Sequence, residues 1–530
     1  MDEYMNEDLT LEQKVGALFS MSFEGVSIDS ETRRHFAACH IANYILFAEN
    51  LGDYKSTANL TISLQQIARD VSGIPAFIST DQEGGMVERL HSGATHFPSN
   101  MAISAAGYNN QTKIIGRMVG KELRALGINL NHAPCVDINN NPLNPVIGIR
   151  SYSDDPKIVA MSGCGYIQGL QESGCIAQAK HFPGHGNTHI DSHLSLPTID
   201  SSLEELEEME LIPFRQAIEV GVDSMMTAHI LFPKLEPDNL PATMSKRILT
   251  GLLRERLGFD GLIMTDSMSM NAIKEYYGME RGCVAAIAAG ADVVCMRADF
   301  DDQRRAYSAV LEAVKSGELP MGRVDDAITR QVRLKTKYAI GFNNENIDAL
   351  VERYPEHEAF ADEISAKSIT LFRDQERLLP ITNRRLIAIS PPPVSVNIAD
   401  DQFDPPMSFA EYLARETGGD FEIIPYEPDA ADISRVINRA DGHGVIVQGA
   451  YNAAFSKGQQ QLASELVKLD IPLIIVALRA PYDIAYMPKS ASALLTYEYT
   501  NKSVQNVTMV LRGQKAYGRI PVSALYQQPR

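Results

Sequence analysis

The sequence lacks several features that mark common protein classes. It contains no tryptophan, which argues against a wide-open polysaccharide cleft because such clefts use large aromatic platforms. Its six cysteines form no CxxC pair, so we interpret them as buried, reduced thiols. The longest apolar run, 471–478, is far too short to cross a bilayer. These absences argue against a disulfide scaffold and a membrane-spanning protein.

Basic residues are also scarce relative to acidic ones. Lys and Arg number 48 against 67 Asp and Glu, a formal net charge of −19. This balance argues against nucleic acid or an anionic membrane surface as a partner. The acidic first residues, 1–8, lack the basic and apolar regions of a secretory signal. We therefore expect a cytoplasmic protein, and nothing in the sequence bears on its oligomeric state.

Ordinary composition and regular alternation predict a folded α/β chain. Hydrophobic residues make up 45% of the sequence and charged residues 22%, close to globular averages. Over the first 340 or so residues, short apolar runs alternate with helical patterns, which is typical of a parallel sheet with helices outside. Seven or eight such units favour a (β/α)8 barrel over an open sheet. The expected strands fall at 43–47, 75–79, 127–130, 175–179, 223–227, 261–264 and 292–296, and the expected helices at 54–71, 110–126, 155–172, 203–220, 245–257 and 278–289.

The pattern changes after Phe342. A polar stretch with Pro355 precedes a predicted helix at 358–367, and a second alternation of apolar runs follows. We expect a barrel over 1–342, a linker with a connecting helix over 343–369, and a smaller αβα sandwich with its own parallel sheet over 370–530. Pro391, Pro392 and Pro393 must lie in a loop.

One segment concentrates chemically useful side chains. Residues 180–193 read KHFPGHGNTHIDSH and hold four of the twelve histidines, directly after the strand expected to end at Ala179. The carboxyl ends of barrel strands form the active-site face. Histidines here could ligate a metal, or brace the loop by hydrogen bonds. A metal site using His185, His189 and His193 would need a helix, which Pro183 and Gly186 oppose.

General acid/base chemistry is the third interpretation, and we favour it. A carboxylate at Asp191 can fix the tautomer of His193 and raise its basicity, while imidazole titrates near neutral pH. Asp266 follows the strand at 261–264 and is a candidate carboxylate nucleophile. Its alternative interpretation is a helix N-cap. Asp81, in a DQEGG segment after the second strand, indicates binding of a polyol or a cation.

Four stretches together resemble glycoside hydrolase family 3, in particular its bacterial β-N-acetylglucosaminidases. They are DQEGG at 81–85 with Arg89, NPLNPVIGIRSY at 141–152, the loop at 180–193, and TDS at 265–267. The KHFPGHG loop with its DSH ending separates this branch from the family's β-glucosidases. The resemblance implies a barrel followed by an α/β domain, a small carbohydrate substrate, and neither a metal nor an organic cofactor.

The resemblance also implies roles for individual residues. Asp266 would be the nucleophile of a retaining mechanism, and His193, partnered by Asp191, would be the acid/base. The hydroxyl groups of the terminal sugar would bind to a set of polar side chains, with His229 in the pocket wall; the set is Asp81, Arg89, Arg150, Lys180 and His181. The expected activity is removal of non-reducing terminal β-linked N-acetylglucosamine from muropeptides or chitooligosaccharides.

Two alternatives stay open, and two positions depart from the family pattern. A phosphorylase would share every residue named, because a neutral imidazole repels phosphate less than a carboxylate does. A non-catalytic sugar-binding protein is the second alternative. Met86 stands where relatives often carry Arg, and Asn187 replaces an acidic residue common in the loop.

Overall fold

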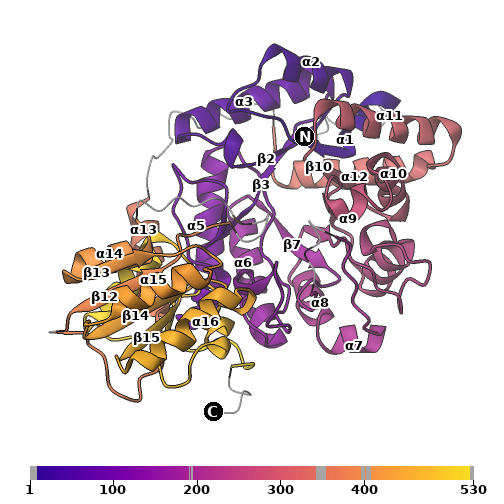
Figure 1. Ribbon diagram of the computed structural model, residues 1–530. Helices are drawn as coiled ribbons and strands as arrows, with labels where there is room; N and C mark the ends of the chain where they lie inside the picture. Colours follow the sequence, from indigo (N-terminus) through magenta and orange to yellow (C-terminus); the bar gives the residue numbers. More distant parts are fainter. Residues whose placement is uncertain are drawn as a thin grey trace.

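The chain folds into a barrel and a smaller sandwich that lie side by side (Figure 1). The computed structural model describes residues 9–189, 191, 195–341, 354–382, 384–395, 400 and 407–525. The last barrel helix ends at Lys337 and the first sandwich strand begins at Thr370. The domain boundary predicted after residue 342 falls outside the described residues, so the exact limits stay predictions.

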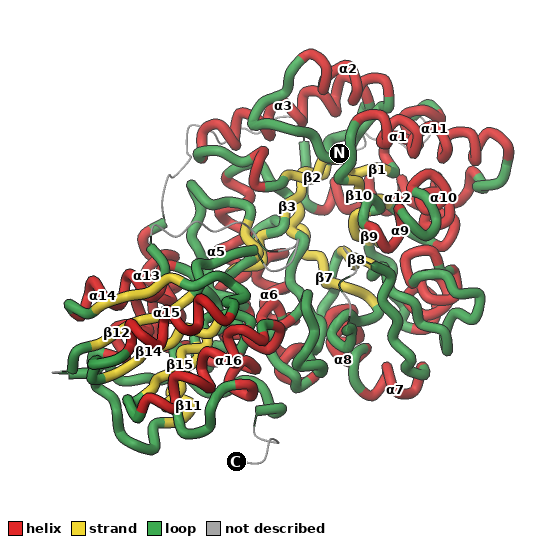
Figure 2. The backbone as a smooth tube through the Cα atoms, in the orientation of Figure 1, coloured by secondary structure: helices red, strands yellow, loops and turns green. Residues whose placement is uncertain are grey.

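Eight parallel strands of the described residues close into the predicted barrel (Figure 2). Closure depends on β1, a three-residue strand that pairs with β10 on one side and with β2 on the other. The apolar runs did not include β1. The strands, in their order around the barrel, are β1 (Phe19–Met21), β10 (Val293–Met296), β9 (Leu262–Ser267), β8 (Ser224–Thr227), β7 (Ile176–Phe182), β6 (Leu130–Asn131), β3 (Phe77–Thr80) and β2 (Asn43–Leu46).

Helices surround the barrel, and local sequence sets their ends. Asp53 begins α3 by accepting a hydrogen bond from the backbone N–H of Ser56 at 2.7 Å. Ser202 and Glu205 form a capping box that begins α7. The helices are α1 (Leu11–Ala17), α2 (Ser30–Ala38), α3 (Tyr54–Val71), α4 (Asn100–Ala105), α5 (Thr112–Ala125), α6 (Pro156–Glu172), α7 (Leu203–Glu208), α8 (Leu211–Glu219), the π-helix η6 (Arg247–Arg256), α9 (Asn271–Lys274), α10 (Met279–Ala289), α11 (Phe300–Ser316) and α12 (Met321–Lys337).

The single helix predicted over 203–220 is wrong, because the chain forms α7 and α8 with a break at Met209 and Glu210. Pro213 has no backbone N–H to donate to the carbonyl of Met209, so a continuous helix would lose a hydrogen bond there. Within the described ranges, no helix combines the length and apolar character needed to cross a bilayer.

The barrel interior is a packed core. Side chains from five strands form one apolar cluster with Leu334, Tyr338 and Ile340 from the end of α12 and just beyond. These last residues close the amino-terminal end of the barrel. The opposite end is therefore the open one, as expected for a barrel whose chemistry lies at the carboxyl ends of its strands.

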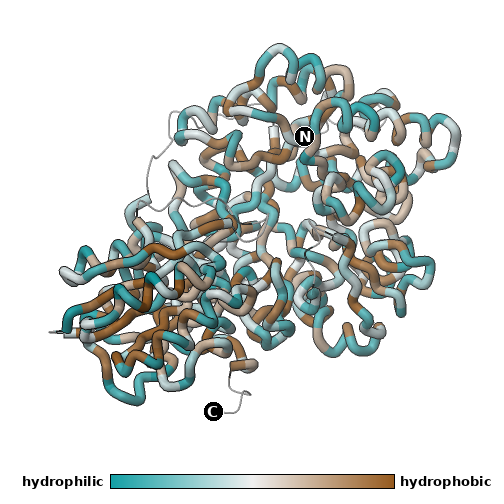
Figure 3. Tube along the Cα trace, in the orientation of Figure 1, coloured by the Kyte–Doolittle hydropathy of each residue, from teal (hydrophilic) through white to brown (hydrophobic). Residues whose placement is uncertain are grey.

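The sandwich contains a mixed six-stranded sheet in the order β11-β16-β15-β14-β12-β13. Five strands are parallel, but β11 runs antiparallel to β16, so the expectation of a wholly parallel sheet is wrong at this edge. Pro391, Pro392 and Pro393 lie in a loop, as predicted. Apolar segments gather in the sheet (Figure 3). The elements are α13 (Pro355–Ser368), β11 (Thr370–Arg373), β12 (Leu386–Ser390), α14 (Phe409–Thr417), β13 (Asp420–Ile423), α15 (Ala430–Ala440), β14 (Val445–Ala450), α16 (Lys457–Leu466), β15 (Leu473–Ala477), β16 (Ser492–Leu495) and α17 (Asn501–Leu511).

Candidate active site

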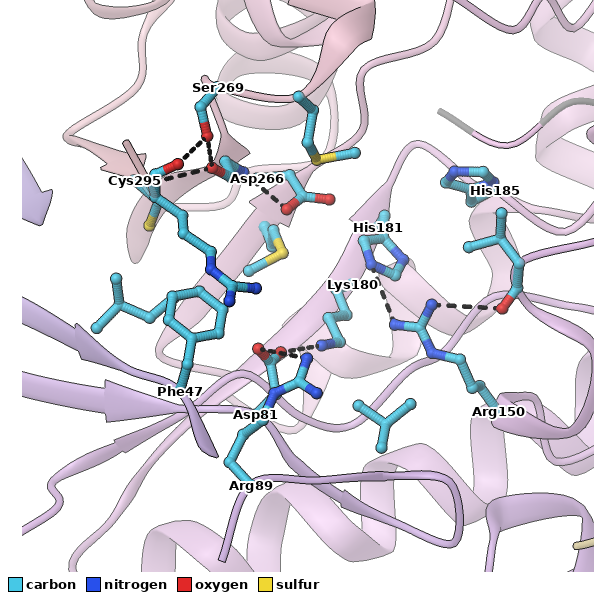
Figure 4. A pocket seen from close by; sticks show the side chains of 17 residues that line it. Phe47, Asp81, Arg89, Arg150, Lys180, His181, His185, Asp266, Ser269 and Cys295 are labelled. Atoms are coloured by element: carbon cyan, nitrogen blue, oxygen red, sulfur yellow. Dashed lines mark hydrogen bonds and ion pairs between the residues drawn. The ribbon is translucent and has the colours of Figure 1, made fainter. Parts of the chain in front are cut away.

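A pocket of about 220 Å³ opens at the carboxyl ends of the barrel strands (Figure 4). Six of the residues predicted to bind sugar or carry out chemistry line it, together with apolar side chains. The lining residues are Ile45, Phe47, Asp81, Val87, Arg89, Val146, Arg150, Lys180, His181, His185, Met226, Asp266, Ser267, Ser269, Met270, Cys295 and Arg297. The pocket is therefore small, largely enclosed by one barrel, and rich in charged groups.

Opposite charges alternate along one wall of the pocket. Lys180 Nζ lies 2.7 Å from Asp81 Oδ1 and 2.6 Å from Glu83 Oε1. Arg150 continues the series through Glu83, and Arg89 Nη2 lies 3.7 Å from Asp81 Oδ2. All five side chains are nearly or fully buried. Since each charge has a partner, the wall presents fixed donors and acceptors with little net charge.

The same pairing controls protonation. Burial by itself raises the pKa of Asp81, but Lys180 and Arg89 outweigh it and hold that pKa well below its usual range. Burial likewise opposes ionisation of Glu83, yet Arg150 and Lys180 bring its pKa to about 2. Both carboxyl groups are ionised at neutral pH, so they accept hydrogen bonds only.

His181 is held by Asp137, a residue that sequence reasoning did not select. The strand β7 extends to Phe182 rather than ending at Ala179, which places Lys180 and His181 on the strand itself. The Lys180–His181 and Phe182–Pro183 peptide bonds are cis. His181 Nδ1 lies 2.7 Å from Asp137 Oδ2, and the backbone N–H of His185 donates to Asp137 Oδ1 at 2.7 Å. Asp137 therefore fixes both the ring of His181 and the start of the following loop.

The loop after β7 is irregular, as Pro183 and Gly186 predicted. A Cβ atom at position 186 would lie 1.6 Å from the carbonyl oxygen of Ile138, so only glycine fits. His185 is buried, with Nδ1 3.0 Å from Thr188 Oγ1, whereas His189 is exposed. Burial and the neighbouring His181 lower the pKa of His185 to about 4. The described part of this loop contains no helix that could align His185 with His189 on one metal.

A different trio could hold a metal ion. Ligand atoms of Cys135, Asp137 and His181 all lie within 4.8 Å of one another. The Cys135 thiol donates to Asp137 Oδ2 at 3.3 Å, and the imidazole of His181 uses the same carboxylate oxygen. This trio is thus already joined by hydrogen bonds.

Asp266 lies on β9, and its carboxylate faces the pocket (Figure 4). The backbone N–H of Ser267 donates to its Oδ1 at 2.7 Å. His229 Nε2 donates to the carbonyl of Ser267 at 3.0 Å, so this buried ring supports the backbone beside Asp266. His229 is not among the lining residues, and its contact with a sugar stays a prediction.

The predicted acid/base pair is only half described. Asp191 is 5% exposed, and its carbonyl accepts a hydrogen bond from the backbone N–H of Ser195 at 3.0 Å. His193 lies outside the described residues. The pairing of Asp191 with His193 therefore stays a prediction.

Comparison with known proteins connects this geometry to a family. A family model described as the glycosyl hydrolase family 3 N terminal domain matches residues 10–334. The chain belongs to glycoside hydrolase family 3. The resemblance inferred from the four sequence stretches is confirmed.

Relatives align with nearly the whole chain. "Beta-hexosaminidase A" of Pseudoalteromonas piscicida is 31% identical over 91% of this chain and 89% of its own. "Beta-N-acetylglucosaminidase/beta-glucosidase" of Cellulomonas fimi is 29% identical over 92% and 89%. A solved family 3 β-N-acetylglucosaminidase from Paenibacillus sp. str. FPU-7 superimposes with a TM-score of 0.90 at 38% identity, covering 97% of this chain and 99% of that one. Glycoside hydrolase chemistry and the barrel-plus-sandwich fold follow.

Within this family 3 chain, two buried carboxylates escaped sequence reasoning. Glu83 lies in the DQEGG stretch, but only Asp81 was singled out there. Asp137 stands in no stretch used for the resemblance. The signal that could have found Asp137 is its place six residues after Asn131, the end of β6, in a loop on the active-site face of a barrel.

Proposed function

We propose that the protein is a retaining exo-β-N-acetylglucosaminidase. The observation that carries the proposal is the carboxylate of Asp266 facing a small pocket whose opposite wall is the paired array around Lys180. About 220 Å³ is less than the roughly 300–1,000 Å³ of sites for drug-sized ligands, so one sugar ring fits better than a chain. The names of the relatives support N-acetylglucosamine as that sugar.

The reaction proceeds by two displacements. Asp266 attacks the anomeric carbon while His193 protonates the departing glycosidic oxygen, which gives a covalent glycosyl-enzyme. His193 then removes a proton from water, and the water oxygen displaces Asp266, so the anomeric configuration is retained. Asp191 orients His193, and ionised Asp266 also stabilises the oxocarbenium-like transition states.

The charged wall recognises the hydroxyl groups of the sugar. Asp81 offers carboxylate oxygens, while Arg89, Arg150 and Lys180 offer N–H donors. His181, whose Nδ1 is held by Asp137, presents its other ring nitrogen, Nε2. These groups are fixed before substrate arrives, so binding costs little reorganisation. A sugar that lacks one hydroxyl leaves buried partners unsatisfied and is discriminated against strongly.

The pairing of charges favours water over phosphate as the second reactant. Each cation that lines the pocket has a carboxylate partner among the described residues, including Arg297, whose Nη2 lies 2.9 Å from Glu49 Oε1. A phosphate dianion would have to compete with these carboxylates. Terminal N-acetylglucosamine of muropeptides or chitooligosaccharides is the natural substrate that we propose.

A panel of aryl β-glycosides that differ only at the sugar C2 substituent tests the proposal. The acetamido sugar should be hydrolysed with the highest kcat/KM, and the β-anomer should appear first by NMR. Preference for the glucoside would reject the substrate. The same assay with and without inorganic phosphate distinguishes free sugar from sugar 1-phosphate, and accumulation of the phosphate ester would identify a phosphorylase. Tight binding without turnover would indicate a sugar-binding protein.

A further inference from the structure

The barrel and the sandwich share one apolar core. The cluster that fills the sandwich also contains side chains from the barrel domain, from α4 and from two turns, whereas most other barrel side chains belong to separate clusters. The barrel contributors are Met86, Met101, Ala102, Ala105 and Ile149. Two of these, Met86 and Ile149, belong to segments that carry pocket residues.

Met86 lies at the turn of the small hairpin formed by β4 (Gln82–Gly84) and β5 (Val87–Glu88). Its side chain is 2% exposed and packs in the sandwich core. Asp81 precedes the hairpin and Arg89 follows it, and both line the pocket. The tip of the hairpin is therefore anchored in one domain while its base forms the sugar-binding wall of the other.

Ile149 anchors the second segment. It lies in the short helical turn η4 (Gly148–Arg150), is 2% exposed, and directly precedes Arg150. Asn139 reinforces the contact, since its Nδ2 donates to the hydroxyl of Tyr482 in the sandwich at 2.9 Å. The Oδ1 of Asn139 accepts the backbone N–H of Gly148 at 3.0 Å. The backbone that carries Arg150 is thus fixed by apolar and polar contacts with the sandwich.

A polar contact supports the hairpin from its other side. Glu498 Oε2 accepts the backbone N–H of Ser99 at 2.8 Å, and the carbonyl of Tyr497 accepts the Ser99 hydroxyl at 2.9 Å. A Cβ atom at Gly85 would lie 2.5 Å from Ser99 Cβ, which shows how closely the hairpin backbone approaches. Tyr497 adopts a φ of 64°, a left-handed conformation rarely used by aromatic residues.

We propose that Met86 and Ile149 are positioning residues through which the sandwich domain sets the geometry of the sugar-binding wall. They contact no substrate. They hold Asp81, Arg89 and Arg150 at the spacing that the alternating ion pairs require. The proposal gives the sandwich a part in sugar recognition and explains why methionine occupies position 86, since an arginine there would place a charge in an apolar core. Its kinetic test rests on the proposed function, because it uses an aryl N-acetylglucosaminide.

Matched truncations separate positioning from general stability. M86A and M487A remove the same atoms from the same apolar cluster, but Met487, 4% exposed, lies in the sandwich and outside the pocket segments. I149A and I433A form a second matched pair. We expect M86A and I149A to lower kcat/KM by about 10- to 100-fold, mainly through KM, because small displacements of binding groups have effects of that size. M487A and I433A should stay within about twofold of wild type, and M86L should recover most of the activity.

A second readout does not depend on the substrate. Hydrogen–deuterium exchange of peptides that cover 81–89 should rise in M86A and stay unchanged in M487A at equal loss of unfolding midpoint. Equal activities and equal exchange in the two variants would overturn the proposal. If M86A does not fold, M86I, which keeps the volume and changes the shape, provides the comparison with M86L. Absence of glycosidase activity in the wild type would reject the proposed function alone, since the exchange difference would still report the coupling.

Discussion

Arg150 holds the carboxylate of Glu83 with two hydrogen bonds, Nε to Oε2 at 3.0 Å and Nη2 to Oε1 at 2.8 Å. Such a two-pronged pair fixes the guanidinium plane as well as its position. Because Lys180 shares Oε1 of the same carboxylate, Glu83 orients two sugar-binding candidates at once. Glu83 therefore joins Arg150 and Lys180, two residues that line the pocket, although Glu83 does not line it itself.

Replacing Glu83 should damage both stability and binding. E83A leaves Arg150 and Lys180 buried with fewer partners, and breaking a buried pair in this way costs about 3–5 kcal/mol. We expect the free energy of unfolding in urea to fall by that amount and KM for the aryl glycoside to rise. E83Q keeps the shape and one oxygen acceptor, so it should lie between E83A and wild type. An E83A variant with wild-type KM would contradict the orienting role.

Asp137 should make the free energy of unfolding depend on pH in the acidic range. Burial raises the pKa of Asp137, but His181, and secondarily His185, outweigh it and bring the pKa to about 2. A carboxyl group with a depressed pKa stabilises the fold above its unfolded pKa of about 4, and this stabilisation is lost as the pH falls toward 2. The stability difference between wild type and D137N should therefore shrink by about 2–3 kcal/mol between pH 5 and pH 2. Urea titrations at several pH values measure it, and a constant difference would remove Asp137 as the titrating group.

Periodicity predicted most of the barrel and failed where elements are short or set by distant contacts. The strands β2 and β3 and the helix α3 match their predicted ranges closely, because long apolar or amphipathic patterns specify them. The three buried residues of β1 carry no such pattern, and only pairing with β2 and β10 defines the strand. The direction of β11 likewise follows from packing against β16 and has no local signal.

The site shows the same division. Asp81, Lys180 and Asp266 were found because they stand at strand ends within distinctive stretches. Asp137 was missed because its importance arises from three hydrogen bonds formed across the fold. Met86 was noticed only as a departure from the family pattern, and its meaning required the sandwich core in which it packs.

Removal of the proposed nucleophile should abolish turnover without unfolding the chain. The Asp266 side chain is only half-buried, and its Oδ1 accepts the backbone N–H of Ser267, a hydrogen bond that an amide oxygen can also accept. We expect D266N to lose about 10⁴-fold or more in kcat, as for other covalent catalysts, with an unchanged unfolding midpoint. Activity close to wild type would remove Asp266 from the mechanism.

The proposed acid/base should show itself through the leaving group. H193A should lose about 10²- to 10⁴-fold on glycosides with poorly acidic leaving groups and far less on activated aryl glycosides, which depart without protonation. A plot of log kcat/KM against leaving-group pKa should therefore be steeper for H193A than for wild type. Parallel plots would argue that His193 has another role. In D191N the same plot should be steeper than for wild type but less steep than for H193A, since Asp191 is proposed to act through His193.

Lys335 is buried at the amino-terminal end of the barrel, and we expect it to lower the free energy of unfolding at neutral pH relative to an uncharged side chain. It is 2% exposed, its Nζ donates to Asn43 Oδ1 at 3.1 Å, and it lies 4.5 Å from the centre of the Phe77 ring. Burial lowers the pKa of Lys335 to about 7, so the unfolded chain binds more protons than the folded one between pH 7 and about 10.4. Wild-type stability relative to K335M should therefore rise with pH across that window.

At pH 7, K335M should be more stable by roughly 2–4 kcal/mol, because the charge penalty of about 1.4 kcal/mol per pKa unit is partly offset by the lost contacts with Asn43 and Phe77. Asn43 Oδ1 keeps the backbone N–H of Phe77 as a donor at 3.1 Å, so the substitution leaves no acceptor unsatisfied. Urea unfolding of both proteins from pH 6 to pH 10 measures the effect, and a difference that does not change with pH would show that Lys335 stays protonated in the folded barrel.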